Sequence, residues 1–398
     1  MRVSAALHYT SVMAKSWKTK LIHTDAKVPE GFRSLATPAY RGSTVLFPES
    51  KAVHDHWDQK DGYTYGLYGT PTTLELAARV CELEGGNYSI VTAGGQGAIA
   101  LVNLALLKAG DHVLIPENIY GPHRRLAYAM LRKFGVEVTL YDPMVGVGIA
   151  ELLKDNTKLV WTESPGSLTM EVQDIPAIVK AAHTRGALVA IDDTWASGVY
   201  LRAFDHGVVI SMQALTKYVG GHSDLLLGSV TVRDRAIYEQ LGEAHHLIGC
   251  AAGPDDCALA LRGMKTLAVR LKQIEQSALE IAKWLAARPE VDTVLHPAMP
   301  SCPGHEFWKR DFTGSAGLFA VVLKEGPSKE QVQQFVDGLE LFELGYSWGG
   351  VTSLAVAYDL SNAKGRPKYG HRIVRFYIGL EDVEDLKADL ERAFAALV

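Results

Sequence analysis

Two acids and a lysine follow short apolar runs in the middle of the chain. Asp192 and Asp193 come directly after the run 187–191, and Lys217 stands 25 residues beyond Asp192, shortly before a pair of glycines. Acids at the carboxyl end of a parallel strand point into the crevice where ligands bind. A lysine in a loop at a strand end, beside a hydroxyl and glycines, is suited to Schiff-base chemistry. Covalent catalysis by a lysine amine is one interpretation of this pattern, and a helix-capping acid with a solvated loop lysine is the other.

A glycine-rich segment, 93–98, lies between an apolar strand-like run and an apolar helix-like run. Glycines there let backbone N–H groups converge at a helix N-terminus, which favours an anion such as phosphate. The segment also fits the dinucleotide pattern G-x-G-x-x-A through Gly95, Gly97 and Ala100, with Glu117 about 20 residues further on. A phosphate site, a dinucleotide site and a plain strand-to-helix turn all remain open at this point.

Taken together, these features favour one cofactor. A pyridoxal phosphate site needs a Schiff-base lysine, an acid facing the pyridinium nitrogen and a cradle for the phosphate. Lys217, Asp192 and the segment 93–98 supply all three. A dinucleotide-binding dehydrogenase, the alternative from a different class, would leave Lys217 and Asp192 without a role.

Short apolar runs alternate with helix-like segments through this part of the chain. The expected strands share a content of Val, Ile and Leu, and they are 88–92, 112–116, 136–141, 158–162, 187–191 and 208–212. The expected helices between them are 98–108, 123–134 and 175–185, with Gly110, Gly135 and Gly186 at or just beyond their C-terminal ends, where a left-handed residue is wanted. Such alternation predicts an α/β fold with a mostly parallel sheet and helices on both faces.

The C-terminal third has a different pattern. Residues 257–287 are typical of one long helical region, 316–323 of a strand, and about 381–397 of a closing helix. We therefore expect an N-terminal segment, 1–69, a large cofactor domain, 70–263, and a smaller α/β domain, 264–398.

Composition excludes several classes of protein. The 398 residues are 47% hydrophobic and 21% charged, which is ordinary globular composition. The formal net charge is −5, and no basic face for nucleic acid is expected. No apolar run approaches the ~20 residues of a membrane helix. Four scattered cysteines without a CxxC pair indicate a reduced, cytoplasmic protein with no metal site.

Longer segments resemble the cysteine/methionine-metabolism family of fold-type I pyridoxal-phosphate enzymes, from about Leu21 to the C-terminus. The segments that carry the resemblance are YGLYGT (65–70), ESPGSLTMEV (163–172), TKYVGGHSD (216–224), GHEFWKRDFTG (304–314), YSWGG (346–350) and RFYIGLED (375–382). The ESPGS and YSWGG versions are similar to the β-lyases of the family, whereas its γ-lyases and γ-synthases more often show ESPTNP.

The resemblance implies a cofactor site made of named residues. Lys217 would hold pyridoxal 5′-phosphate as a Schiff base and act in catalysis, Asp192 would pair with the pyridinium nitrogen, and Tyr120 would stack on the ring. The implied phosphate ligands are the backbone N–H groups of Gly95 and Gln96, the Thr216 hydroxyl, and Tyr65 of the neighbouring subunit. The sites would therefore be shared within a homodimer or homotetramer.

The resemblance also implies a substrate site. Arg375 would bind the α-carboxylate of a sulfur amino acid, with Ser347, Trp348 and Tyr68 nearby. The implied reaction is α,β-elimination of L-cystathionine to homocysteine, pyruvate and ammonia. A cysteine or cystine lyase, a γ-elimination or γ-replacement enzyme, and an amino-acid racemase would use nearly the same residues and stay open.

The chain departs from the family pattern at three positions, one of which is Gly94, where the phosphate loop of the family usually has a serine. Leu67 and Tyr68 stand where β-lyases often carry arginines, one for the cofactor phosphate and one for the distal end of the substrate. Either Arg124 or Arg125, just after Tyr120, replaces the missing cation, or the distal pocket is less polar. We expect replacement by one of these arginines.

Overall fold

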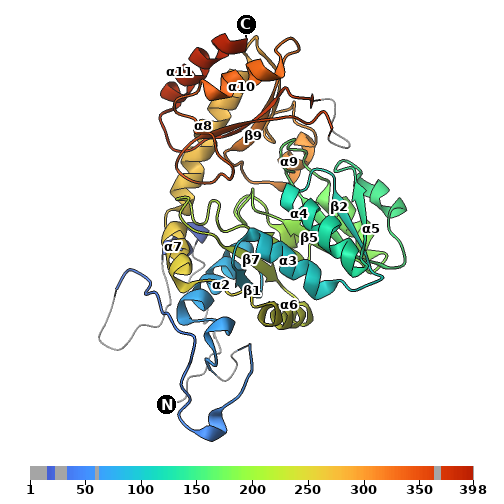
Figure 1. Cartoon of the computed structure of the whole chain (residues 1–398), viewed down its shortest axis with the longest axis vertical. Coiled ribbons are helices and arrows are strands. Elements are labelled where there is room, and N and C mark those ends of the chain that lie inside the picture. The colour runs from blue at the N-terminus through green and yellow to red at the C-terminus, as the bar shows by residue number, and fades with distance from the viewer. Residues whose placement is uncertain (1–15, 23–33, 59–61, 363–368, 398) are drawn as a thin grey trace.

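A seven-stranded sheet forms the centre of the larger of two domains (Figure 1). The computed structural model describes residues 16–22, 34–58, 62–362 and 369–397. The sheet order is β1-β7-β6-β5-β4-β2-β3, and β7 alone runs antiparallel to its neighbours. The strands are β1 Tyr88–Thr92, β2 His112–Pro116, β3 Glu137–Tyr141, β4 Thr157–Glu163, β5 Leu188–Asp192, β6 Ile210–Gln213 and β7 Gly228–Val232. The predicted α/β class with a mostly parallel sheet is confirmed.

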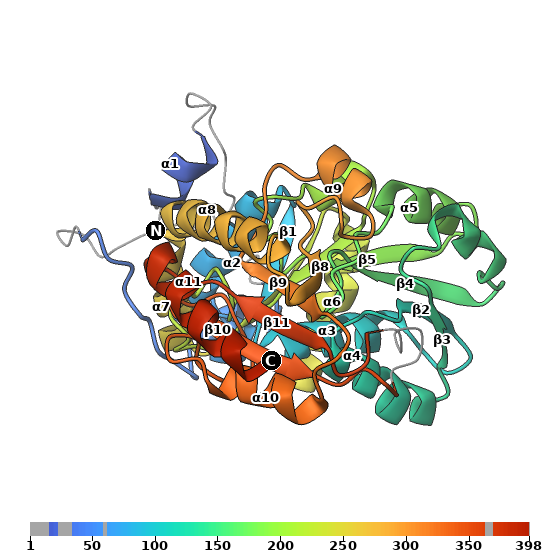
Figure 2. The same ribbon diagram turned by 90° about the horizontal axis from the view of Figure 1, so that it is seen from above.

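Helices cover both faces of this sheet, which is why its strands are apolar on both sides. Residues of α3 and α6, such as Ile99 and Leu241, form one core with the sheet, and residues of α2 and α5, such as Leu76 and Ile178, form another on the opposite face. Figure 2 shows α3 and α4 on one side of the sheet and α5 on the other. The helices are α2 Pro71–Glu84, α3 Gly95–Leu106, α4 Gly121–Leu126, α5 Ile175–His183, α6 Arg235–Ile248 and α7 Pro254–Met264.

Two helical predictions were wrong in detail. The segment 123–134 is not one α-helix, because α4 ends at Leu126 and passes into a π-helical turn, Ala127–Leu131, and a 3-10 turn. The segment 257–287 is two helices, α7 and α8 (Leu267–Ala286). The break follows Gly263, where a Cβ would lie only 2.3 Å from the carbonyl oxygens of Val219 and Gly220. Helix α7 is thus pressed against the loop that follows Lys217.

The smaller domain contains a four-stranded antiparallel sheet in the order β10-β11-β9-β8. Helices α8, α10 and α11 pack on it through a separate core that includes Phe319, Phe335 and Phe376. Its remaining elements are β8 Val291–Leu295, α9 His305–Asp311, β9 Leu318–Leu323, α10 Lys329–Asp337, β10 Leu354–Tyr358, β11 Ile373–Tyr377, α11 Val383–Ala393 and the 3-10 turn Phe394–Leu397. The domain boundaries at 69/70 and 263/264 stay predictions.

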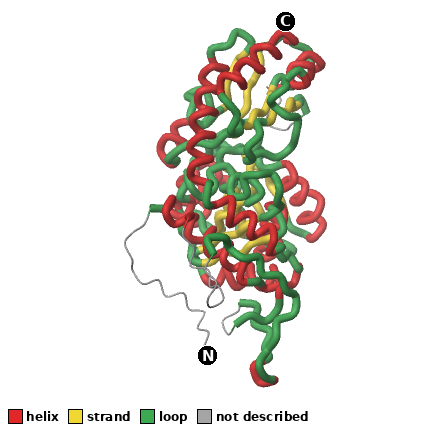
Figure 3. Tube along the Cα trace, turned by 90° about the vertical axis from the view of Figure 1, so that its left-hand side faces the viewer, coloured by secondary structure: helices red, strands yellow, loops and turns green. Residues whose placement is uncertain are grey.

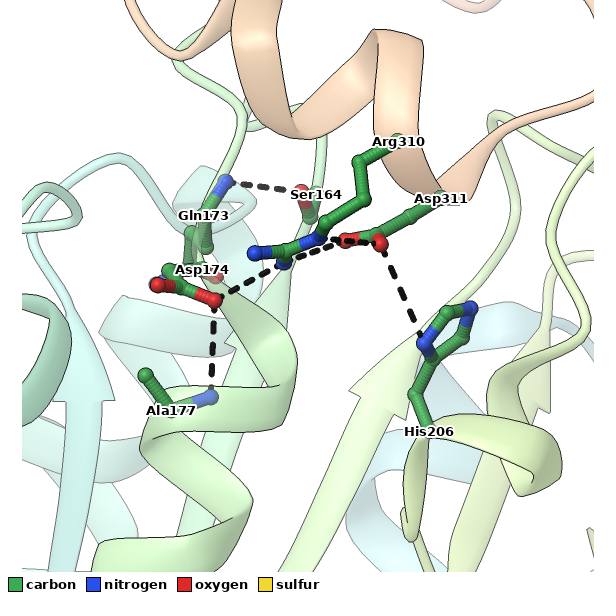
Figure 4. A network of polar contacts seen from close by, with 7 residues as sticks. All are labelled: Ser164, Gln173, Asp174, Ala177, His206, Arg310 and Asp311. Atoms are coloured by element: carbon green, nitrogen blue, oxygen red, sulfur yellow. Dashed lines mark hydrogen bonds and ion pairs between the residues drawn. The ribbon is translucent and has the colours of Figure 1, made fainter.

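Helix α9 connects the two domains through a polar network (Figure 4). Arg310 donates to the Asp174 carboxylate at 2.8 Å and to Asp311 at 2.7 and 2.8 Å. The same Asp174 oxygen accepts the Ala177 N–H at 3.4 Å and caps α5. The start of a large-domain helix and the end of α9 are therefore held by one guanidinium.

The described N-terminal residues form an arm with little regular structure. It contains α1 (Trp17–Ile22), 3-10 turns at Ser50–Ala52 and Gly66–Tyr68, and an isolated bridge between Thr44 and Tyr65. Part of this arm extends away from the large domain at the end opposite the C-terminal domain (Figures 1 and 3). Throughout the described ranges, no helix has both the length and the apolar character needed to cross a bilayer.

Candidate active site

Lys217 lies in the turn after β6, and both domains hold its backbone. Its N–H donates to the Ala214 carbonyl at 3.0 Å, and its own carbonyl accepts the Gly221 N–H at 2.8 Å. From the small domain, Gly349 comes so close, at φ +93°, that a Cβ there would lie 2.8 Å from the Lys217 Cα. Any other residue at position 349 would displace the lysine.

The Lys217 side chain points toward the small domain. Its Nζ donates to the Ser347 hydroxyl at 2.5 Å and lies 5.3 Å from the centre of the Trp348 ring. Burial and the nearby Arg375 charge lower the pKa of Lys217 to about 8, against an opposing effect of Asp192. A substantial fraction of this amine is therefore neutral near physiological pH, as a nucleophile or general base must be.

Asp192 and Asp193 face opposite sides of the sheet, as alternation along a strand requires. Asp192 accepts from the Thr194 N–H at 3.1 Å and from its hydroxyl; burial raises its pKa, and the Thr194 hydrogen bonds and the Lys217 charge oppose that shift. Asp193 accepts the Gly198 N–H at 3.0 Å, and burial and Glu84 raise its pKa well above the usual range. Of the two acids, Asp192 is the one on the Lys217 side.

The glycine-rich segment forms the start of α3, close to the Lys217 loop. Helix α3 begins at Gly95 after Gly94 at φ +88°, and its first amides have no intrahelical acceptor. A Cβ on Gly95 would lie 2.6 Å from that of Ala214, so the cradle packs on the segment leading to Lys217. Among the described residues, the buried Gln96 Oε1 has no hydrogen-bond partner. An anion cradle, a partly neutral lysine and a buried acid fit pyridoxal phosphate.

Arg375, on β11, brings a half-buried positive charge to the same place. Its Nη2 donates to the Ser347 carbonyl at 3.4 Å, and its guanidinium lies 5.5 Å from the Tyr358 ring centre. No carboxylate in the described parts of the chain forms an ion pair with it. The arrangement can bind a carboxylate from outside the chain, close to the Lys217 amine.

Tyr120 reaches the site from the start of α4, with 43% of its surface exposed. Burial and the charges of Asp192 and Glu163 raise its pKa, which places its ring near both carboxyls. Its N–H donates to Glu163 Oε2 at 2.6 Å. The sequence analysis gave Glu163 no role. A signal for it was present in the sequence, because Glu163 directly follows the expected strand 158–162, just as Asp192 directly follows the expected strand 187–191.

Other predicted residues lie elsewhere or are already engaged. The Thr216 hydroxyl exchanges hydrogen bonds of 3.1 Å with the backbone of Leu227. The Tyr65 ring contacts Tyr68 at 6.1 Å, and Tyr68 contacts His246 of α6 at 5.5 Å. Both tyrosines thus contact each other and α6, and no described contact connects them with Lys217. A role for either tyrosine at the site of a partner subunit stays a prediction.

The two arginines expected to replace the missing cation lie on α4. The Arg124 guanidinium is 6.0 Å from the Tyr128 ring centre, and Arg125 is exposed. Neither contacts Lys217 or Arg375 through an interaction seen between described residues. Replacement of the distal cation by one of them stays a prediction.

Comparison with known proteins agrees with this geometry. Residues 18–395 match the model of the Cys/Met metabolism PLP-dependent enzyme family. The cystathionine β-lyase of Escherichia coli is 40% identical over 96% of this chain and 99% of its own. That of Haemophilus influenzae is 40% identical over 94% and 97%.

A solved structure is similarly close. The cystathionine γ-synthase of Xanthomonas oryzae pv. oryzae, in complex with cystathionine, superposes with a TM-score of 0.89 at 29% identity, covering 96% of this chain and 98% of that one. The family model spans nearly the whole chain, and the dinucleotide alternative has no support. The chain belongs to the Cys/Met metabolism family of PLP-dependent enzymes, and its cofactor is pyridoxal 5′-phosphate.

Proposed function

We propose that this enzyme cleaves L-cystathionine by α,β-elimination, giving homocysteine, pyruvate and ammonia. The observation that carries the proposal is the pairing, across the domain junction, of a partly neutral Lys217 amine with the half-buried Arg375 cation, which forms no ion pair with a described carboxylate. The Lys217 amine would face the reactive Cα of an amino acid, and Arg375 would bind its α-carboxylate. The sulfur substrate comes from the similarity to the two bacterial β-lyases.

Each residue of the site has a defined task in this reaction. Pyridoxal phosphate, when bound, supplies a conjugated ring that accepts the electron pair left on the substrate Cα. Asp192 provides the negative charge that keeps the ring nitrogen protonated. Arg375 binds the α-carboxylate and so directs the Cα–H bond toward Lys217. The neutral Lys217 amine takes this proton and returns one to the departing sulfur.

Ser347 and Trp348 position the Lys217 side chain for this proton transfer. The Ser347 hydroxyl accepts from Nζ, and its carbonyl accepts from Arg375, so one residue connects the base with the carboxylate-binding cation. The Trp348 ring covers Nζ and packs on Tyr218 at 5.3 Å between ring centres. This cover shields one side of the half-buried amine.

The products distinguish this reaction from its relatives. Purified enzyme should release pyruvate and homocysteine from cystathionine. Release of 2-oxobutyrate and cysteine would instead establish γ-elimination, and accumulation of D-amino acids without sulfur release would establish a racemase. Chromatography of the 2-oxo acids after derivatisation separates the first two outcomes, and chiral analysis identifies the third.

We also propose that the enzyme is a homodimer or homotetramer and that it is located in the cytoplasm. A homodimer or homotetramer would let the arm of one subunit bring Tyr65 to the phosphate site of another. The four cysteines are free, which suits the reducing cytoplasm.

A further inference from the structure

Two buried carboxyl groups lie side by side at the carboxyl end of the sheet. Glu163 ends β4 and Asp192 ends β5, and the two are register partners in these adjacent parallel strands. Glu163 is 7% exposed and Asp192 9%. Ionising both of two adjacent buried carboxyls costs free energy, because the two negative charges repel each other and neither is fully hydrated.

Donors surround the Glu163 carboxyl. Its Oε2 accepts the Tyr120 N–H at 2.6 Å, and its Oε1 accepts from the Ser167 hydroxyl at 2.6 Å. These hydrogen bonds lower the pKa of Glu163, but burial and the Asp192 charge outweigh them. Asp192 also accepts two hydrogen bonds, both from Thr194 to one oxygen, and it has the Lys217 charge nearby in addition.

The charges around the pair divide the roles in the same way. Burial first, and the Asp192 charge second, raise the pKa of Glu163 to about 8. Tyr120, before α4, is the other titratable group that contacts it, and the cations Lys217 and Arg375 act on Asp192 and Tyr120. Burial raises the pKa of Asp192 as well, but the hydrogen bonds from Thr194 and the Lys217 charge oppose that effect, so the negative charge of the pair is better stabilised on Asp192 than on Glu163.

The Tyr120 backbone is the part of the site that depends on this acid. Tyr120 immediately precedes α4, and its carbonyl accepts the Arg124 N–H at 3.1 Å. Its N–H is fixed by Glu163, on a strand of the central sheet. This hydrogen bond ties the Tyr120 backbone to the end of β4, beside the end of β5 at Asp192.

We infer that Glu163 is a positioning residue that anchors Tyr120 at the cofactor site as a neutral acid, leaving the negative charge of the pair to Asp192. The inference rests on the proposed cofactor site and not on the identity of the substrate. A glutamine at this position can accept the Tyr120 N–H and donate to Ser167, so Glu163→Gln retains the anchor without an ionisable group. Glu163→Ala removes both.

The first test is the pH dependence of stability. A glutamate that stays neutral in the folded enzyme but ionises when unfolded costs stability as pH rises from about 4.5 to about 8. We expect the Tm of Glu163→Gln, relative to wild type, to increase between pH 5 and pH 8 at fixed protein concentration. The increase should be smaller with pyridoxal phosphate bound, because the ring cation relieves the repulsion on the pair. An equal Tm difference at both pH values, without cofactor, would show that Glu163 is ionised.

The second test isolates the anchor. Cofactor affinity, measured by titrating full-length protein with pyridoxal phosphate, should fall about tenfold in Glu163→Ala and stay within about twofold in Glu163→Gln. In a Tyr120→Ala background the same Glu163→Ala change should cost less than about twofold, because nothing remains to position. If the loss in that background equals the loss in wild type, Glu163 does not act through Tyr120. Neither test measures lyase turnover, so both results can be interpreted even if the proposed substrate is wrong.

Discussion

At the scale of the residue, Lys217 shows how a site gives up stability for reactivity. Burial and the Arg375 charge hold its folded pKa at about 8, well below an unfolded lysine. Without cofactor, the charged amine therefore opposes folding below pH 8, and stability should rise with pH from about 8 to about 10.5. Lys217→Met should stabilise the cofactor-free protein by about 1–3 kcal/mol at pH 7 and abolish that rise.

Urea unfolding of the two proteins at pH 7 and pH 10 measures this effect. The same variant should lose turnover by several orders of magnitude, since both the cofactor link and the proton carrier vanish. In wild type, borohydride should fix the cofactor to the peptide that contains Lys217. Attachment to any other lysine would refute the assignment.

The neighbouring acids Asp192 and Asp193 should respond in opposite ways to the same chemical change. Asp192→Asn removes the charge that faces the ring nitrogen and should weaken cofactor binding by at least about tenfold, with a large loss of turnover. Asp193→Asn keeps an acceptor for Gly198 and removes a carboxyl whose pKa burial raises. It should stabilise the protein by about 1–3 kcal/mol at pH 7, with the gain fading toward pH 4.

Cofactor titration and unfolding curves for both variants test this pair. A greater loss of cofactor affinity in Asp193→Asn than in Asp192→Asn would mean that the strand is shifted by one residue. The position of Asp193 opposite Asp192 followed from strand alternation alone. By contrast, the place of Glu163 beside Asp192 depends on the pairing of β4 with β5, which could not be predicted from the sequence. The hydrogen bonds between Thr216 and Leu227 likewise depend on how the 216–227 loop folds.

At the scale of the element, apolar runs predicted strands well and helix interruptions poorly. All six strands expected in the large domain are present, because residues buried on both faces must be apolar. The strand β7 was missed, since its sequence GSVTV lacks large apolar residues. The break between α7 and α8 was missed because it arises from contact of Gly263 with the loop after Lys217, far away in sequence.

The α9–α5 connection yields a prediction of its own. The Asp311 carboxylate is nearly inaccessible, at 3% side-chain exposure, and depends on Arg310 and, at 4.0 Å, on His206 (Figure 4). Arg310→Met keeps the aliphatic stem but leaves Asp311 and Asp174 without their cation. We expect a loss of about 1–3 kcal/mol in the free energy of unfolding, and a smaller loss for Arg310→Lys, which retains the charge.

Chemical unfolding of the three proteins at matched ionic strength measures the effect. Arg235→Met offers a control of similar exposure, because Arg235 pairs with Glu239 within α6 and its ion pair connects no second domain. If Arg310→Met left unfolding unchanged, the network would be incidental to the docking of α9.

At the scale of the whole molecule, the site exists only where the two domains meet. Lys217 and Asp192 come from the large sheet, while Ser347 and Arg375 come from the small domain. Direct bonds fix the junction, such as the Trp195 indole N–H to the Leu318 carbonyl at 2.9 Å. The sequence predicted which residues form the site through motif resemblance, whereas their convergence depends on the docking of the two domains.

The arm provides the last prediction, because its tyrosines lie away from the Lys217 of their own chain. Tyr65 is 46% exposed, and Leu35 and Leu46 of the arm are 93% and 89% exposed, an unusual state for apolar side chains. A second subunit that covers the arm would bury them and receive Tyr65 at its phosphate site. Tyr65→Ala and Lys217→Ala should then each be inactive, and each mutant should complement the other.

In a dimer that pairs the two variants, one site has both defects and the other has none. Random exchange of equal amounts should place intact sites at about one quarter of all positions, so activity should return to about 25% of wild type. Two affinity tags allow isolation of the mixed dimer, whose activity should approach about half of wild type. Mixed dimers that form but stay inactive would mean that Tyr65 serves the site of its own chain, and an active Tyr65→Ala variant would mean that it serves neither site. Activity in an isolated monomer would likewise exclude a shared site.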